Sequence, residues 1–199
     1  MDELTKIFNL DDQQPEPKQG ALLVAKPTVD DLCFKRSVIL LISNSEHSSM
    51  GLIVNHQAGY TLNEAIPGID CEEEIPLYLG GPVDTEMLFY IHTLGPDIIP
   101  DCREVANGIY VGGSYDAIKE YVNSGAPVNG KVKFIIGYSG WSAGQLNDEI
   151  AHHDWAVSHF LSRNLIMREG EDDIWKGVVA SFGEKYRLWL TWPNSIILN

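Results

Sequence analysis

The glycine-rich stretch at residues 137–150 constrains the fold more than any other part of this chain; it runs Gly-Tyr-Ser-Gly-Trp-Ser-Ala-Gly-Gln-Leu-Asn-Asp-Glu-Ile. It follows an apolar run at residues 131–136 that is typical of a strand. Ser142 and Gln145, three residues apart, match a capping box, in which the hydroxyl accepts from a free helix amide and the glutamine side chain reaches back. The pattern predicts a strand, a tight turn and a helix, with Trp141 at the corner.

The rest of the chain is rich in short strands. Apolar, β-branched or aromatic runs bounded by turns predict strands at residues 21–25, 38–42, 51–55, 77–79, 87–92, 109–111 and 132–136. Asn107-Gly108 favours a tight hairpin turn, because both residues tolerate positive φ. Thr61 and Glu64 form a second capping box, and helical spacing predicts helices at residues 114–123 and 173–182.

Length and composition indicate one globular domain. The 199 residues are 44% hydrophobic, and a polar, proline-bearing segment at residues 11–19 is typical of a linker. We therefore assign residues 1–19 to an N-terminal extension and linker, and residues 20–199 to a single domain.

Several features indicate a cytoplasmic protein. No apolar run approaches the roughly 20 residues of a membrane helix, and the N-terminus lacks the basic and apolar regions of a signal peptide. Cys33, Cys71 and Cys102 are widely spaced and form no Cys-x-x-Cys pair for zinc or redox chemistry. We expect a reducing compartment and no membrane association.

The charge balance disfavours nucleic acid as a direct partner. There are 14 basic and 28 acidic residues, giving a formal net charge of −14. DNA backbones are bound by clustered Lys and Arg that displace counterions, whereas here no basic stripe appears, and Lys131 with Lys133 is a pair and not a patch. We expect no direct duplex binding by a monomer; an oligomer could still gather local positive charge.

No catalytic motif rises above its structural interpretation. Gly-Tyr-Ser139-Gly-Trp141 differs from the nucleophile elbow G-x-S-x-G at its last position, and no spacing selects a histidine as base. Ser114 after two glycines resembles an anion-binding helix start, but plain helix capping is favoured. Asp148 and His152 could share a helix face and bind a cation, although a solvated face is the favoured interpretation. We assign no catalytic residue, metal site or cofactor.

The glycine-rich stretch also resembles the signature G-Y-x-G-W-x-x-G-Q-L-x-x-E-I of the bacterial YqgE/AlgH family. Segments at residues 22–27, 34–38, 51–55 and 80–83 agree in order, so the resemblance runs from about residue 20 to about residue 183. Asn147, where the family usually shows an acidic residue, and the tail at residues 186–199 depart from it. The resemblance implies an α+β fold in which twisted mixed sheets form a barrel-like core with helices outside. The family is commonly labelled as transcriptional regulators, and it supplies no catalytic residues.

Two turns are the candidate site. Pro82 removes a ladder donor, so we expect strand pairing to stop at Gly80-Gly81-Pro82. Because the resemblance includes this turn and the Trp141 turn, we expect both to adjoin one pocket. The candidate ligand or partner surface is Asn55, Gly80, Gly81, Pro82, Trp141, Gln145 and Glu149.

The expected function is regulatory or binding, without catalysis, and the expected partner is another protein or a small molecule. The alternative is an enzyme or small-molecule sensor that uses the Gly80–Pro82 and Gly137–Gln145 turns as pocket walls. The sequence does not determine the oligomeric state.

Overall fold

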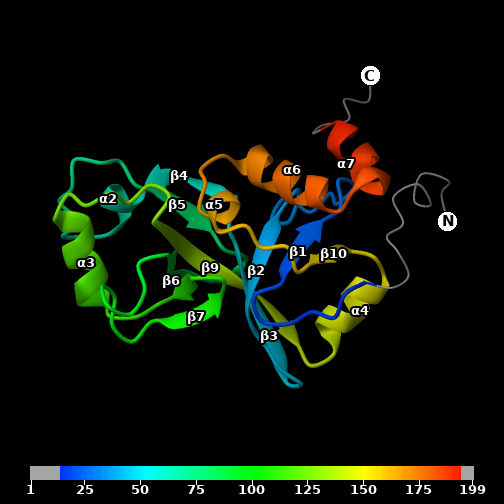
Figure 1. Cartoon of the computed structure of the whole chain (residues 1–199), viewed down its shortest axis with the longest axis horizontal. Helices are drawn as coiled ribbons and strands as arrows, with labels where there is room; N and C mark the ends of the chain where they lie inside the picture. The colour runs from blue at the N-terminus through cyan, green and yellow to red at the C-terminus, as the bar shows by residue number, and fades with distance from the viewer. Residues whose placement is uncertain (1–13, 194–199) are drawn as a thin grey trace.

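The computed structural model describes residues 14–193, which form one large open sheet with helices on both sides (Figure 1). The strands are β1 (Leu22–Ala25), β2 (Val38–Asn44), β3 (Ser48–Ile53), β4 (Gln57–Thr61), β5 (Pro76–Leu79), β6 (Val83–His92), β7 (Arg103–Ala106), β8 (Ile109–Val111), β9 (Val132–Ser142) and β10 (Trp155–Ser158). The helices are α2 (Leu62–Ala65), α3 (Tyr115–Asn123), α4 (Gln145–Ala151), α5 (Arg163–Ile166), α6 (Glu171–Ser181) and α7 (Arg187–Thr191). Most of the predicted N-terminal extension lies outside the described residues.

Strand β9 connects the two halves of the sheet. Its neighbours follow the order β10-β1-β2-β3-β9-β6-β8-β7, and β4 and β5 are attached beside it. Along one edge β9 pairs antiparallel with β6; along the other it pairs in parallel with β5 through residues 134–136 and antiparallel with β3 through residues 139–142. Gly137, with φ of +68°, lies where the partner changes. The sheet is therefore mixed, as expected.

The expected barrel-like core is wrong. Closure would require the two outermost strands, β10 and β7, to pair, and within residues 14–193 they do not. All four residues of β1 are inaccessible to solvent, because helices cover both faces of this part of the sheet. A strand covered on both faces belongs to an open layered sheet, so the α+β class is confirmed and the barrel is not.

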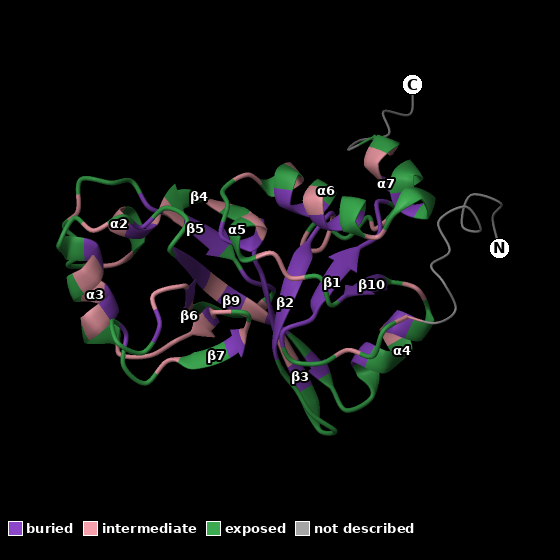
Figure 2. Cartoon of the chain, in the orientation of Figure 1, coloured by how far each residue is buried: buried purple, intermediate pink, exposed green. Residues whose placement is uncertain are grey.

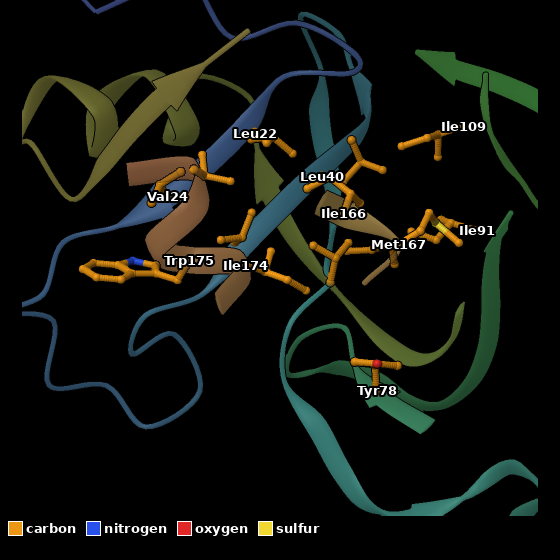
Figure 3. Packing of buried hydrophobic residues seen from close by; sticks show 14 of the residues in the cluster. Leu22, Val24, Leu40, Tyr78, Ile91, Ile109, Ile166, Met167, Ile174 and Trp175 are labelled. Atoms are coloured by element: carbon orange, nitrogen blue, oxygen red, sulfur yellow. The ribbon is translucent and has the colours of Figure 1, made fainter. Parts of the chain in front are cut away.

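Three hydrophobic clusters fill the layers. One lies between β1, β2, β3 and the helices α5, α6 and α7, and includes Trp175 and Trp189 (Figure 3). The second lies on the opposite face, under α4, and includes Trp141 and Trp155. The third packs α2 and α3 against β5, β6 and the first part of β9. Figure 2 shows the resulting pattern, with buried strands in the centre and exposed outer helix faces.

Most of the predicted local structure is confirmed. Thr61 and Glu64 form both halves of their capping box, and Ser114 caps α3 by accepting from the Ala117 amide. Asn107 and Gly108 both have positive φ in the turn between β7 and β8. Strand β10 begins at Trp155, and strand β4 was not predicted. Among residues 14–193, no helix combines the length and apolar character needed to cross a membrane.

Candidate functional site

A strand, a turn and a helix follow one another in the predicted order, but the turn was predicted too early. Strand β9 continues through Ser142, so Trp141 lies within the strand and not at the corner. Ser142 is still paired with Ser48 in the sheet, and Gly144, with φ of +78°, occupies the N-cap position of α4. The capping box is therefore half wrong: the Ser142 hydroxyl caps nothing, while the Ser142 amide donates to Gln145 Oε1 at 3.0 Å. The left-handed turn at Gly144 moves the helix start beyond the reach of the serine side chain.

The two predicted turns lie against each other. A Cβ atom on Gly80 would lie 2.2 Å from the Gly137 carbonyl oxygen, and one on Gly81 would lie 2.3 Å from the Tyr138 carbonyl oxygen. Ser139 Oγ donates to the Gly80 carbonyl at 3.1 Å. Pairing reaches Gly80, whose amide donates to the Ile136 carbonyl at 2.7 Å. The glycines are required for this close backbone contact, which brings the residue after Gly81, Pro82, beside β9.

A cleft of about 390 Å³ opens beside these turns; we call it the Trp cleft. It is lined by Val29, Phe34, Pro82, Val83, Ser139, Gly140, Trp141, Gln145, Glu149, Asp154 and Trp155. Its volume lies in the range of small-molecule sites. Of the predicted site residues, Pro82, Trp141, Gln145 and Glu149 are brought together here.

Glu149 is held in place by three neutral donors. The indole Nε1 atoms of Trp141 and Trp155 both donate to Glu149 Oε2 at 2.8 Å, and Gln145 Nε2 donates to Glu149 Oε1 at 2.9 Å. Both oxygens act as acceptors, as in a carboxylate. The carboxylate is thus positioned before any ligand arrives.

Three aromatic rings surround this carboxylate edge to face. Trp141 and Trp155 have ring centroids 6.2 Å apart at 84°, and Phe34 meets Trp155 at 5.5 Å and 90°. Both indoles are 5% exposed. Such perpendicular pairs are favourable aromatic geometries, so the rings form a rigid apolar wall.

The charge of the cleft is negative. Glu149 and Asp154 line it, and among residues 14–193 no Lys, Arg or His does. Lys26 is buried and does not line the cleft; burial lowers the pKa of its amine, and the Asp154 carboxylate acts in the opposite direction.

Asn55 is not part of the Trp cleft. Trp141 pairs with Ser49 on β3, whereas Asn55 lies six residues further along the chain, beyond the end of β3 at Ile53. It lines a separate cleft of about 460 Å³, the Asn55 cleft, together with Leu32, Lys35, Arg36, His56, Gln57, Leu79, Glu171 and Asp172.

Several polar groups of the Asn55 cleft are bonded to other groups within the protein. Asn55 accepts from the Val38 amide at 2.7 Å and donates to the carbonyls of Arg36 and Glu171 at 2.9 and 3.1 Å. Arg36 forms a salt bridge with Asp172 at 3.1 Å. The pKa of Asp172 is lowered: burial acts to raise it, but hydrogen bonds from Lys176 and Arg36 outweigh that effect.

Within residues 14–193, the serine and histidine weighed as catalytic candidates bond to backbone carbonyls and not to each other. Ser139 is 1% exposed, and its hydroxyl donates to the Gly80 carbonyl. His152 Nδ1 is bonded to the Asp148 carbonyl instead. Across residues 14–193, no three His, Cys, Asp or Glu side chains are grouped to hold a metal ion.

Sequence reasoning missed Phe34, Asp154 and Trp155. Trp155 had a local signal, since it begins a buried run after the polar residues 152–154. Phe34 had none, because it reaches the cleft from a loop more than 100 residues away.

Fold and cleft together define an open α+β protein with a preformed acidic, aromatic cleft beside its longest strand. The AlgH-like family model matches residues 22–187, and the chain belongs to this family. The match ends where the tail at residues 186–199 departs from the resemblance noted above.

Relatives match over nearly the whole length. The chain is 42% identical over 193 residues to a UPF0301 protein of Parabacteroides distasonis, covering 97% of each chain. It is 39% identical over 195 residues to a UPF0301 protein of Bacteroides fragilis, covering 98% of each.

Two solved structures share the fold. The crystal structure of protein DIP2367 from Corynebacterium diphtheriae is 25% identical with a TM-score of 0.69, covering 89% of this chain and 93% of that one. The solution structure of the AlgH protein from Pseudomonas aeruginosa is 24% identical with a TM-score of 0.69, covering 92% and 99%.

Proposed function

We propose that this chain is a non-catalytic binding protein with a regulatory role in the cytoplasm, and that its ligand or partner group occupies the Trp cleft. The observation that carries the proposal is the position of Glu149, fixed at the cleft by two indole N–H groups that donate to one oxygen. A small number of fixed polar groups in an apolar concavity is the usual composition of a ligand site.

The alternative function, an enzyme, has less support. A hydrolase of the serine type would require a base near the Ser139 hydroxyl, and that hydroxyl donates to a backbone carbonyl. A sensor that binds a small molecule in the same cleft is compatible with the proposal.

Native mass spectrometry of the protein purified from its own cells tests the proposal. Val83→Trp places a large ring in the Trp cleft, and Leu79→Trp, in the Asn55 cleft, is the matched control. We expect a bound mass in the wild type and in Leu79→Trp, and its loss in Val83→Trp.

A bound mass that survives Val83→Trp would contradict the proposal. So would the absence of any bound mass, combined with unchanged indole N–H resonances when the small-molecule fraction of the cells is added.

A regulatory role through direct DNA contact is not part of the proposal. At a net charge of −14 the chain is repelled by duplex DNA, and screening over about 8 Å at physiological salt does not remove repulsion at contact. We predict no saturable binding to random or promoter duplexes at about 0.15 M salt and protein concentrations up to about 100 µM. Fluorescence anisotropy with labelled duplexes measures this binding. Sequence-dependent binding with a dissociation constant below micromolar would contradict the prediction and support direct regulation of transcription.

A further inference from the structure

We infer that the Trp cleft takes a small organic cation, an amine or quaternary ammonium group carried on an apolar body. This inference rests on the proposed function and adds the chemical class of the ligand.

The side-chain donors that line the cleft are already used. The two indole N–H groups and the Gln145 amide donate to Glu149, and the Ser139 hydroxyl donates to the Gly80 carbonyl. An anionic or acceptor-rich ligand would therefore meet two carboxylates and few free donors. Such a ligand would lose its hydration without replacement, which is costly.

Acceptors, in contrast, are available. A carboxylate has about four acceptor sites, and Glu149 receives three hydrogen bonds, so about one site remains. The exposed side chain of Asp154 lines the same cleft and makes no hydrogen bond or salt bridge within the described residues. A donor-bearing ligand fits this arrangement.

Glu149 also lacks a counter-charge. Within residues 14–193 no basic side chain lies within salt-bridge distance of Glu149, whereas Asp172, one of two acids lining the other cleft, has both Arg36 and Lys176 within 3.2 Å. A partly buried carboxylate without a cation is costly, and a ligand cation would remove that cost.

The aromatic wall selects for the same class. Cations are attracted to the faces of Trp and Phe rings, and aromatic rings combined with carboxylates form the sites that bind quaternary ammonium groups. Phe34, Trp141 and Trp155 line the cleft of about 390 Å³; both indoles are largely buried, so the half-buried Phe34 offers the most accessible ring. The overall charge of −14 adds long-range attraction for cations.

The test uses three probes with the same benzyl group and different charge: benzyltrimethylammonium, benzyl alcohol and benzylsulfonate. Each is titrated into the full-length protein while the indole N–H resonances are recorded, with Trp141→Phe and Trp155→Phe used for assignment. We expect the ammonium probe to shift both resonances saturably, the alcohol to bind at least about tenfold more weakly, and the sulfonate not to bind.

Glu149→Gln keeps an acceptor oxygen for the indoles but removes the charge, and should weaken binding of the ammonium probe about tenfold. Asp154→Asn, whose carboxylate makes no hydrogen bond or salt bridge among the described residues, should weaken it about threefold, and Glu171→Gln in the Asn55 cleft should leave it unchanged.

Two results overturn the inference: binding of the alcohol or sulfonate as tight as that of the ammonium probe, or unchanged ammonium affinity in both Glu149→Gln and Asp154→Asn. If a neutral or anionic probe binds while the cation does not, only the ligand class is wrong. If no probe shifts the indoles and Val83→Trp retains its co-purified mass, the proposed function is wrong as well.

Discussion

The two clefts of this protein are similar in size but differ in whether their carboxylates are paired with basic side chains. The Asn55 cleft, of about 460 Å³, contains the salt bridge between Arg36 and Asp172, whereas the Trp cleft, of about 390 Å³, holds a carboxylate bonded only to neutral donors. Volume alone does not separate a structural concavity from a binding site. The separation comes from whether the polar groups already have partners inside the protein.

Lys133, which bonds to the carbonyl of the residue before Asn55, is also held by contacts within the protein. Lys133 on β9 is 2% exposed, donates to the Val54 carbonyl at 2.6 Å, and lies 4.3 Å from the centre of the Tyr78 ring. The Lys133 amine, like the Arg36 guanidinium, therefore bonds to groups inside the protein. The comparison therefore predicts that substitutions around the Asn55 cleft change stability most.

Asn55→Ala should have the largest effect. It leaves three backbone groups, the Val38 amide and the carbonyls of Arg36 and Glu171, without this partner, and each loss costs about 1–3 kcal/mol. We expect the free energy of unfolding to fall by about 4 kcal/mol in urea denaturation. Asn147→Ala, at an exposed asparagine on α4, is the control. A loss below about 1 kcal/mol would show that the Asn55 bonds are not structural.

Trp141→Ala tests whether the wall of the Trp cleft also supports the fold. The indole is 5% exposed, so its removal should leave a cavity and lower the free energy of unfolding by about 3 kcal/mol. Trp141→Phe keeps most of the ring and loses only the donor to Glu149, which should cost about 1 kcal/mol. Chemical denaturation measures both, and equal losses would mean that the hydrogen bond, not the packing, holds the wall.

Lys133 makes stability depend on pH. Burial lowers the pKa of its amine from the ordinary value of 10.5 to about 7, with Glu169 acting in the opposite direction. Between these values the unfolded chain binds more protons than the folded one, so the free energy of unfolding rises with pH. Relative to Lys133→Met, the wild type should gain about 2 kcal/mol between pH 7 and 9.

Urea denaturation of both proteins across this pH range measures that difference. Lys131→Met, at an exposed lysine two residues earlier, controls for the loss of one positive charge. A difference between wild type and Lys133→Met that stays constant with pH would contradict the effect of burial.

Ser142→Ala should have the smallest effect. Its amide, not its hydroxyl, bonds to Gln145, and the exposed side chain caps no helix. We expect a change within about 0.5 kcal/mol, in contrast to the roughly 1 kcal/mol of a lost N-cap. A larger loss in thermal or urea unfolding would place the N-cap of α4 at Ser142 after all.

Patterns within a few residues were enough to predict several local elements. The Asn107-Gly108 turn and the caps at Thr61 and Ser114 follow from backbone preferences and hydrogen bonds that neighbouring residues satisfy among themselves. The close approach of Gly80 and Gly81 to β9 was expected only as a shared pocket, and the glycines are the reason it occurs.

The sequence by itself determined most strands and the order strand, turn, helix around residues 132–151, because these depend on local periodicity and turn chemistry; the α+β class followed from the family resemblance. Only the tertiary structure decided that the sheet stays open, that β9 continues through Trp141, that Asn55 lies outside the Trp cleft, and that Phe34 and Trp155 complete the cleft. Those outcomes depend on strand register and on contacts between distant segments. Glu149 shows the same difference. The sequence identified it as a candidate site residue, but only the residues packed around it determine that its carboxylate is bonded to neutral donors.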